Sequence, residues 1–185
     1  MKQSAYAKKV IKEARLEDCN PTKTAMEPGL KLDKEDESEP VNETEYRKLI
    51  GSLRYLTHTR PDITYAVGYV SRFMEKPKTT HMKAVKHLIR YIKGTLDYGI
   101  QYSRSKEAEI TGYSDSSYGD QDDGKGTTGT IFYYKDSPIT WTSQKQSTVA
   151  LSSCESEFMV VTSQHVKQYG YKEYSANSQV NNQGR

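Results

Sequence analysis

The sequence predicts an α+β fold in which a helical segment comes first and a sheet with one helix follows. Between residues 42 and 96, apolar side chains recur every three or four positions, which is the period of amphipathic helices. From residue 97 onward the pattern changes to alternation, which is typical of half-buried strands. With 185 residues the chain is long enough for one ordinary domain or two small ones.

Composition limits both the core and the kind of partner. Hydrophobic residues make up 34% of the chain and the mean hydropathy is −0.87, so we expect a modest core. The net charge of +3 permits contact with nucleic acid but is below that of a dedicated binder. Cys19 and Cys154 make neither a disulfide framework nor a metal cluster, which favours a reducing compartment. The sequence shows no secretory leader and no membrane-spanning run, so we expect an intracellular protein, cytoplasmic or nuclear, without a membrane partner.

The first part of the chain predicts a short helix and a linker. Residues 3–13 form the helix, and its surface is strongly basic through Lys8, Lys9 and Lys12. Residues 31–40 are charged, mostly acidic and without apolar periodicity, which predicts an exposed linker. We therefore place one segment at 1–30 and the acidic linker at 31–41.

Three helices are predicted after the linker. Asn42, with Glu45 three residues later, fits the capping box of the first, which must end before Pro61. The second spans about 62–73. The third follows a cap at Thr79 or Thr80 and ends at Gly94, which we place as the glycine that follows a helix.

The third helix carries four cations on the face opposite its apolar stripe: Lys83, Lys86, Arg90 and Lys93. The ordinary interpretation is a solvated helix face, and the functional one is a track for nucleic-acid phosphates. His81 and His87 show no metal-ligand spacing and are placed on the surface of this helix.

The second half of the chain reads as strands followed by a helix. Alternating runs predict strands at 98–102, 109–114, 130–134 and 139–142, the last two as a hairpin. Residues 126–129 are predicted as a turn, and Ser152 or Ser153 can cap a helix through about residue 168. Residues 169–185 are rich in Asn, Gln, Ser and Gly and predict a disordered tail.

Several long motifs resemble one family. YRKLIGSLRYLTHTRPDITYAV at 46–67 and RYIKGT at 90–95 resemble the connection region of copia-type LTR retrotransposon Pol polyproteins. GYSD at 112–115, ITWTSQKQ at 139–146 and VALSSCESEFM at 149–159 resemble the RNase H domain of that family. Residues 3–26 resemble the tail of its reverse transcriptase. The resemblance covers about residues 2–168, in the order of the family, with 42–96 as the helical connection segment.

The resemblance implies an RNase H-like mixed sheet that cuts RNA in an RNA–DNA hybrid with two Mg²⁺ ions. The first carboxylate of the family falls on Asp115 and the second on Glu157, with Glu155 as the near alternative. Side chains that are two positions apart on a helix point about 200° apart, so only one glutamate can face the strand. Without the resemblance, Asp115 is a strand-end turn residue and Glu157 a first-turn helix carboxylate.

The chain departs from the family after about residue 168, where the strands carrying the later carboxylates do not follow. We therefore expect an incomplete RNase H-like domain at 97–168. Holding two Mg²⁺ ions requires several converging carboxylates, so Asp115 and Glu157 predict residual metal affinity with little or no turnover. Two alternatives stay open: a weak Mg²⁺-dependent hybrid nuclease, and a non-enzymatic nucleic-acid-binding module that uses the four cations. Association with other Pol segments is a further expectation.

Overall fold

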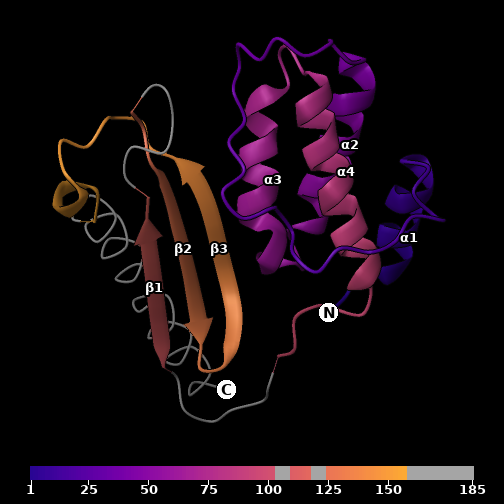
Figure 1. The fold of residues 1–185 in the computed structure, drawn as a ribbon. Helices are drawn as coiled ribbons and strands as arrows, with labels where there is room; N and C mark the ends of the chain where they lie inside the picture. The colour runs from indigo at the N-terminus through magenta and orange to yellow at the C-terminus, as the bar shows by residue number, and fades with distance from the viewer. Residues whose placement is uncertain (103–108, 118–123, 158–185) are drawn as a thin grey trace. The chain divides into compact units, whose positions relative to one another are not determined.

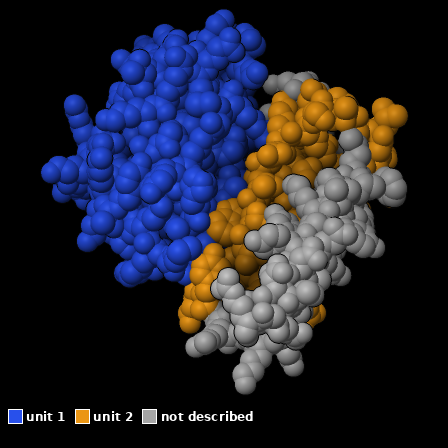
Figure 2. All heavy atoms as spheres, turned by 180° about the vertical axis from the view of Figure 1, so that it is seen from behind, with its two compact units in different colours: residues 1–100 blue, residues 101–185 orange. Residues whose placement is uncertain are grey.

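The computed structural model describes residues 1–102, 109–117 and 124–157, and it confirms the α+β class. The chain divides into two compact units, Met1–Ile100 (unit 1) and Gln101–Arg185 (unit 2), which Figure 2 colours separately. The α-helices that are labelled in Figure 1 lie in unit 1, and the labelled strands lie in unit 2. The predicted helix beyond residue 157 and the predicted tail at 169–185 lie outside the described residues.

Unit 1 is built on four α-helices, α1 (Ser4–Glu13), α2 (Glu43–Leu56), α3 (Thr64–Val70) and α4 (Thr79–Gly94). Short 3₁₀ turns, Pro61–Ile63 and Ser71–Phe73, flank α3, so the predicted second helix is broken into three pieces. The apolar stripes of these helices form one core, whose fully buried members include Ile50, Leu53, Ile63, Val85, Leu88 and Ile89. No helix in the described part of the chain is long and apolar enough to cross a membrane.

The predicted start of α2 is confirmed, whereas the predicted start of α4 is wrong. Asn42 Oδ1 accepts a hydrogen bond from the Glu45 backbone N–H at 2.9 Å, as a helix cap should. At α4 the cap residue is Lys78, and its backbone N–H donates to His81 Nδ1 at 2.9 Å. His81 is completely buried and its ring stacks on Phe73 at 4.1 Å, so its placement on the helix surface is also wrong.

Gly94 is the last residue of α4 rather than the residue that follows the helix. A Cβ added at Gly94 would lie 3.0 Å from Pro21 Cβ. The glycine therefore lets the segment after α1 approach the end of α4, which is a different reason from the helix stop that the sequence predicts.

The acidic segment 31–41 is held on unit 1, which differs from the exposed linker that its composition predicts. Leu32 is buried, and its backbone N–H donates to the Tyr69 hydroxyl at 3.1 Å. The Asp36 carboxylate accepts from the Thr80 hydroxyl at 2.7 Å, and this bond, helped by Ser38, lowers the pKa of Asp36 to about 2. The other charged side chains of the segment are exposed, while its backbone and the Asp36 carboxylate are anchored. Composition therefore predicted only the exposed part of the arrangement.

The strand predicted at 98–102 is also absent: the stretch has no regular secondary structure, and its residues through Ile100 belong to unit 1. The Ile100 backbone N–H donates to Met1 O at 2.8 Å, and the Met1 amino group donates to Ile100 O. Ile100 is buried. The alternating pattern therefore buries one side chain, that of Ile100, whereas Tyr98 and Tyr102 are exposed.

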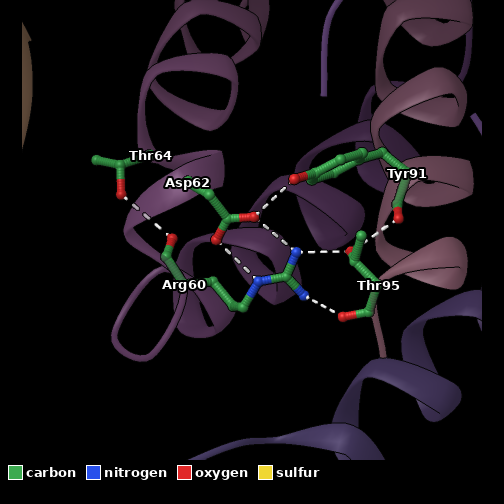
Figure 3. A network of polar contacts seen from close by, with 5 residues as sticks. All are labelled: Arg60, Asp62, Thr64, Tyr91 and Thr95. Atoms are coloured by element: carbon green, nitrogen blue, oxygen red, sulfur yellow. Dashed lines mark hydrogen bonds and ion pairs between the residues drawn. The ribbon is translucent and has the colours of Figure 1, made fainter. Parts of the chain in front are cut away.

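Arg60 ties the turn after α2 to the end of α4 (Figure 3). Its guanidinium donates to both Asp62 carboxylate oxygens, at 2.9 and 2.7 Å, and to Thr95 O and Oγ1, at 2.9 and 2.7 Å. Tyr91 closes the network by donating to Asp62 Oδ2 at 3.0 Å, and burial together with this carboxylate raises the pKa of Tyr91. The Arg60 side chain is only 5% exposed. The Arg-Pro-Asp motif therefore acts as a structural clamp.

Unit 2 contains a sheet of β1 (Ile110–Ser116), β2 (Thr127–Tyr134) and β3 (Ser137–Lys145) in the order β1-β2-β3. Both described pairings are antiparallel, so the described strands do not show the mixed sheet that we predicted. The hairpin of β2 and β3 is confirmed and is longer than predicted. Gly129 pairs with Asp115 inside the ladder, so the turn predicted at 126–129 is wrong.

Candidate functional site

Asp115 lies near the end of β1 and is exposed to solvent. Paired residues of antiparallel strands point to the same face, and Asp115 is opposite Gly129, which has no side chain. Tyr113, two residues earlier on the same face, is also exposed. The carboxylate therefore projects from an open part of the sheet, as an accessible ligand would.

Glu155 and Glu157 lie in a helical turn at 153–157, and both are exposed. The Ser152 hydroxyl accepts from the Glu155 backbone N–H at 3.1 Å, which confirms Ser152 as the cap. The Glu155 carboxylate accepts from the Leu151 backbone N–H at 2.6 Å. The Glu155 carboxylate thus has a backbone partner at the start of the helix, whereas no hydrogen bond of the Glu157 carboxylate is found among the described residues.

The side chain that this turn places against β1 is Ser156. It is 1% exposed, its hydroxyl lies 3.1 Å from Ser116 Oγ, and it accepts from Gln146 Nε2 at 2.9 Å. Neighbours on a helix point about 100° apart, so Ser156 in this position turns Glu157 away from the contact. Sequence reasoning missed Ser156, although Ser152 and Glu155, at capping-box spacing, fix the rotation of the turn that buries it.

The described residues do not fit a two-metal site. Among them, no three or more Asp, Glu, His or Cys side chains come together in a way that could hold a metal ion. Asp115 and Ser116 are successive strand residues and point to opposite faces, and the side chain that contacts the helical turn is that of Ser116. The pair Asp115 and Glu157 can therefore offer separate carboxylates but not the converging set that two Mg²⁺ ions require.

The four cations of α4 do not form one free face. Lys83 and Lys86 are exposed, and no ion pair within the described ranges involves them. Arg90 Nε donates to Asn20 O at 2.6 Å, and Lys93 Nζ donates to the backbone carbonyls of Glu17 and Cys19. The later two cations therefore hold the segment after α1 on α4.

His87 lies beside the same segment and is partly buried. Its Nε2 lies 3.0 Å from Thr24 O, and its Nδ1 lies 3.4 Å from a Glu27 carboxylate oxygen. Helical spacing correctly groups the cations on one face, but it cannot reveal that a distant segment covers half of that face. Lys83 and Lys86 remain as the candidate contacts for phosphate.

Comparison with known proteins finds transposon Pol polyproteins among the relatives of the chain. The chain is 38% identical over 162 residues to the retrovirus-related Pol polyprotein from transposon RE1 of Arabidopsis thaliana, covering 87% of this chain. It is 35% identical over 170 residues to the corresponding polyprotein from transposon TNT 1-94 of Nicotiana tabacum, covering 88%. It is 31% identical over 160 residues to an uncharacterized mitochondrial protein of Arabidopsis thaliana, covering 85% of this chain and 66% of that relative.

The two polyproteins are far longer than the chain, which spans 11% and 13% of their lengths. No protein-family model and no solved structure matches the chain.

Proposed function

Because the chain belongs to the copia-type family of retrotransposon Pol polyproteins, we propose that it is the segment joining the reverse transcriptase to the RNase H domain. The order of the motifs supports this assignment, since the connection motif at 46–67 precedes the RNase H-like motifs at 112–159. Unit 1 then corresponds to the reverse transcriptase tail, the acidic linker and the connection, and unit 2 to the beginning of the nuclease domain.

We further propose that these 185 residues do not cleave RNA–DNA hybrids by themselves. The observation that carries this proposal is the burial of Ser156, rather than a glutamate, against β1. Asp115 and Glu157 are both exposed. Separate exposed carboxylates compete poorly with water for Mg²⁺, so weak binding of one ion is the most that this arrangement supports.

We expect the purified chain to give no product from a labelled RNA–DNA hybrid in Mg²⁺. Titration of Mg²⁺ followed by NMR should show weak binding that Asp115→Asn removes. Asp136→Asn is the matched control, because Asp136 is an exposed aspartate of the same sheet, in the turn after β2. Cleavage that depends on Asp115 would contradict the proposal, because the described geometry would then be a working site.

Lys83 and Lys86 support a second candidate function, in which the chain binds the phosphate backbone of the hybrid without cleaving it. The double variant Lys83→Glu, Lys86→Glu should weaken hybrid binding and lower the slope of log affinity against log salt by about two, because each lost phosphate contact lowers it by about 0.9. The control is Lys34→Glu, Lys76→Glu, which changes net charge equally at two exposed lysines outside α4. Equal effects of the two double variants would exclude a localised contact.

A further inference from the structure

We propose that the surface between α1 and α2 binds unpaired nucleotides, with Tyr55 as the stacking ring and Lys9 and Lys48 as phosphate contacts. The class of partner rests on the proposed function. The surface itself uses none of the residues invoked there, since it lies outside α4 and outside unit 2. It is named the α1–α2 surface below and consists of Tyr6, Lys9, Lys48, Gly51, Tyr55 and His58.

Three aromatic rings lie in contact along this surface. Tyr6 on α1 meets Tyr55 on α2 edge to face, with ring centroids 4.8 Å apart, and Tyr55 lies 5.8 Å from the His58 ring. Tyr55 is nonetheless 53% exposed. An exposed ring already held by its neighbours loses little conformational entropy when a base stacks on it, and such stacking accepts any base.

The helix backbone at Gly51, beside Tyr55, is not covered by any side chain of the described residues. Gly51 is four residues before Tyr55 and therefore lies one turn away on the same side of α2. A Cβ added at Gly51 would meet no heavy atom within 4 Å. Glycine weakens a helix interior, and packing does not require it here. The result is exposed helix backbone next to the ring, with free space at the position that a Cβ would take.

The charges around the patch suit phosphates. Lys9 lies one turn from Tyr6 on α1, and Lys48 lies one turn from Gly51 on α2; both are exposed. Lys48 is 3.8 Å from the Glu13 carboxylate, a surface pair weak enough to yield to a phosphate. The acidic segment precedes the opposite end of α2, about 20 Å along the helix from Tyr55. Positive charge and exposed rings therefore coincide on the α1–α2 surface.

The first test measures fluorescence anisotropy of a labelled oligothymidylate of about 15 nucleotides with the full chain. Tyr55→Ala should weaken binding about tenfold, and Tyr55→Phe should retain it, because the ring stacks without its hydroxyl. Tyr65→Ala is the matched control: Tyr65 is 49% exposed, but its ring lies parallel to that of Tyr69 on α3. Binding unchanged in Tyr55→Ala would overturn the proposal.

The second test fills the free space at Gly51 with a side chain. Gly51→Leu places a side chain where the structure has free space and improves helix propensity, so the chain should fold normally, as circular dichroism can verify. Binding of the oligothymidylate should still weaken about tenfold, because the leucine occupies the position of the base. Competition by polyglutamate as strong as by unlabelled oligothymidylate would overturn the proposal in favour of a general anion surface.

The two proposals can fail separately. The hybrid assay with Lys83→Glu, Lys86→Glu tests α4, whereas the single-stranded probe with Gly51→Leu tests the α1–α2 surface. Loss of single-strand binding in Gly51→Leu with hybrid binding unchanged supports the further inference whatever the role of α4.

Discussion

Replacing Arg60 by alanine is expected to destabilise unit 1 by about 3 kcal/mol, near the lower end of what the loss of one partner costs a buried ion pair. The side chain is 5% exposed, while that of Asp62 is 32% exposed, so water can partly compensate the carboxylate left behind. Thr95 also loses two donors, and the guanidinium leaves the Tyr91 and Tyr98 rings, which lie 5.8 and 5.4 Å from it. A loss of this size lowers the melting temperature of a 100-residue unit by about 15 °C.

The measurement separates the two units. Far-ultraviolet circular dichroism follows mainly the helices of unit 1, whereas fluorescence of Trp141, the single tryptophan, follows β3 of unit 2. Arg60→Lys keeps the charge but loses the two-pronged contact with Asp62, so its effect should be intermediate. Tryptophan and helix transitions shifted equally in Arg60→Ala would contradict a clamp confined to unit 1.

Replacing His81 by alanine is expected to cost about 3 kcal/mol at neutral pH. The ring is completely buried and stacked on Phe73, so its removal leaves a cavity. Its Nδ1 accepts from the Lys78 N–H, and its Nε2 lies 2.8 Å from Asp33 O, so both backbone groups lose a partner. Chemical denaturation followed by circular dichroism measures the loss; a change below about 1 kcal/mol would show that the site collapses without penalty.

The same ring makes unit 1 sensitive to acid. Nδ1 accepts one hydrogen bond while Nε2–H donates the other, so the native ring is neutral, and burial lowers the pKa of His81. Asp33 and Asp36 oppose this shift and Lys78 favours it. Because the unfolded ring takes up a proton below pH about 6.5 and the folded ring resists it, stability is full above that pH and falls below it.

The matched comparison uses the free energy of unfolding between about pH 7.5 and 5. His81→Ala should flatten the profile in this window, whereas His58→Gln, which changes an exposed histidine, should leave the slope intact. Asp36 acts in a separate and lower window, because its pKa falls from 3.8 to about 2 and its contribution is lost only as pH falls through that range. An unchanged slope in His81→Ala would assign acid sensitivity to another group.

The helices of unit 1 could be predicted because their burial follows an apolar period. Asn42 and the apolar period that follows it predicted α2 within a few residues. The same reasoning failed at His81 and at the acidic segment, where polar side chains and backbone carbonyls make the contacts. Periodicity reports which side chains avoid water, and it carries no signal for a backbone that is held by hydrogen bonds beneath charged side chains.

The candidate site shows a similar division. The motifs indicated that the strand of Asp115 and the helical turn of Glu157 belong together, and the structure joins these elements. The rotation of the turn was not predicted. It is fixed by the Ser152 hydroxyl on the Glu155 N–H, by the Glu155 carboxylate on the Leu151 N–H, and by the buried hydroxyl of Ser156. Likewise, a helical wheel groups Lys83 with Lys93 but does not show that Lys93 binds carbonyls of the segment after α1.

The hydrogen bonds between Met1 and Ile100 bring the two ends of unit 1 to one place. In a polyprotein, the chain would enter and leave such a module at the same point. The domain before it and the domain after it would then be tethered to a common point, at a spacing set by their own linkers rather than by the width of the helical unit.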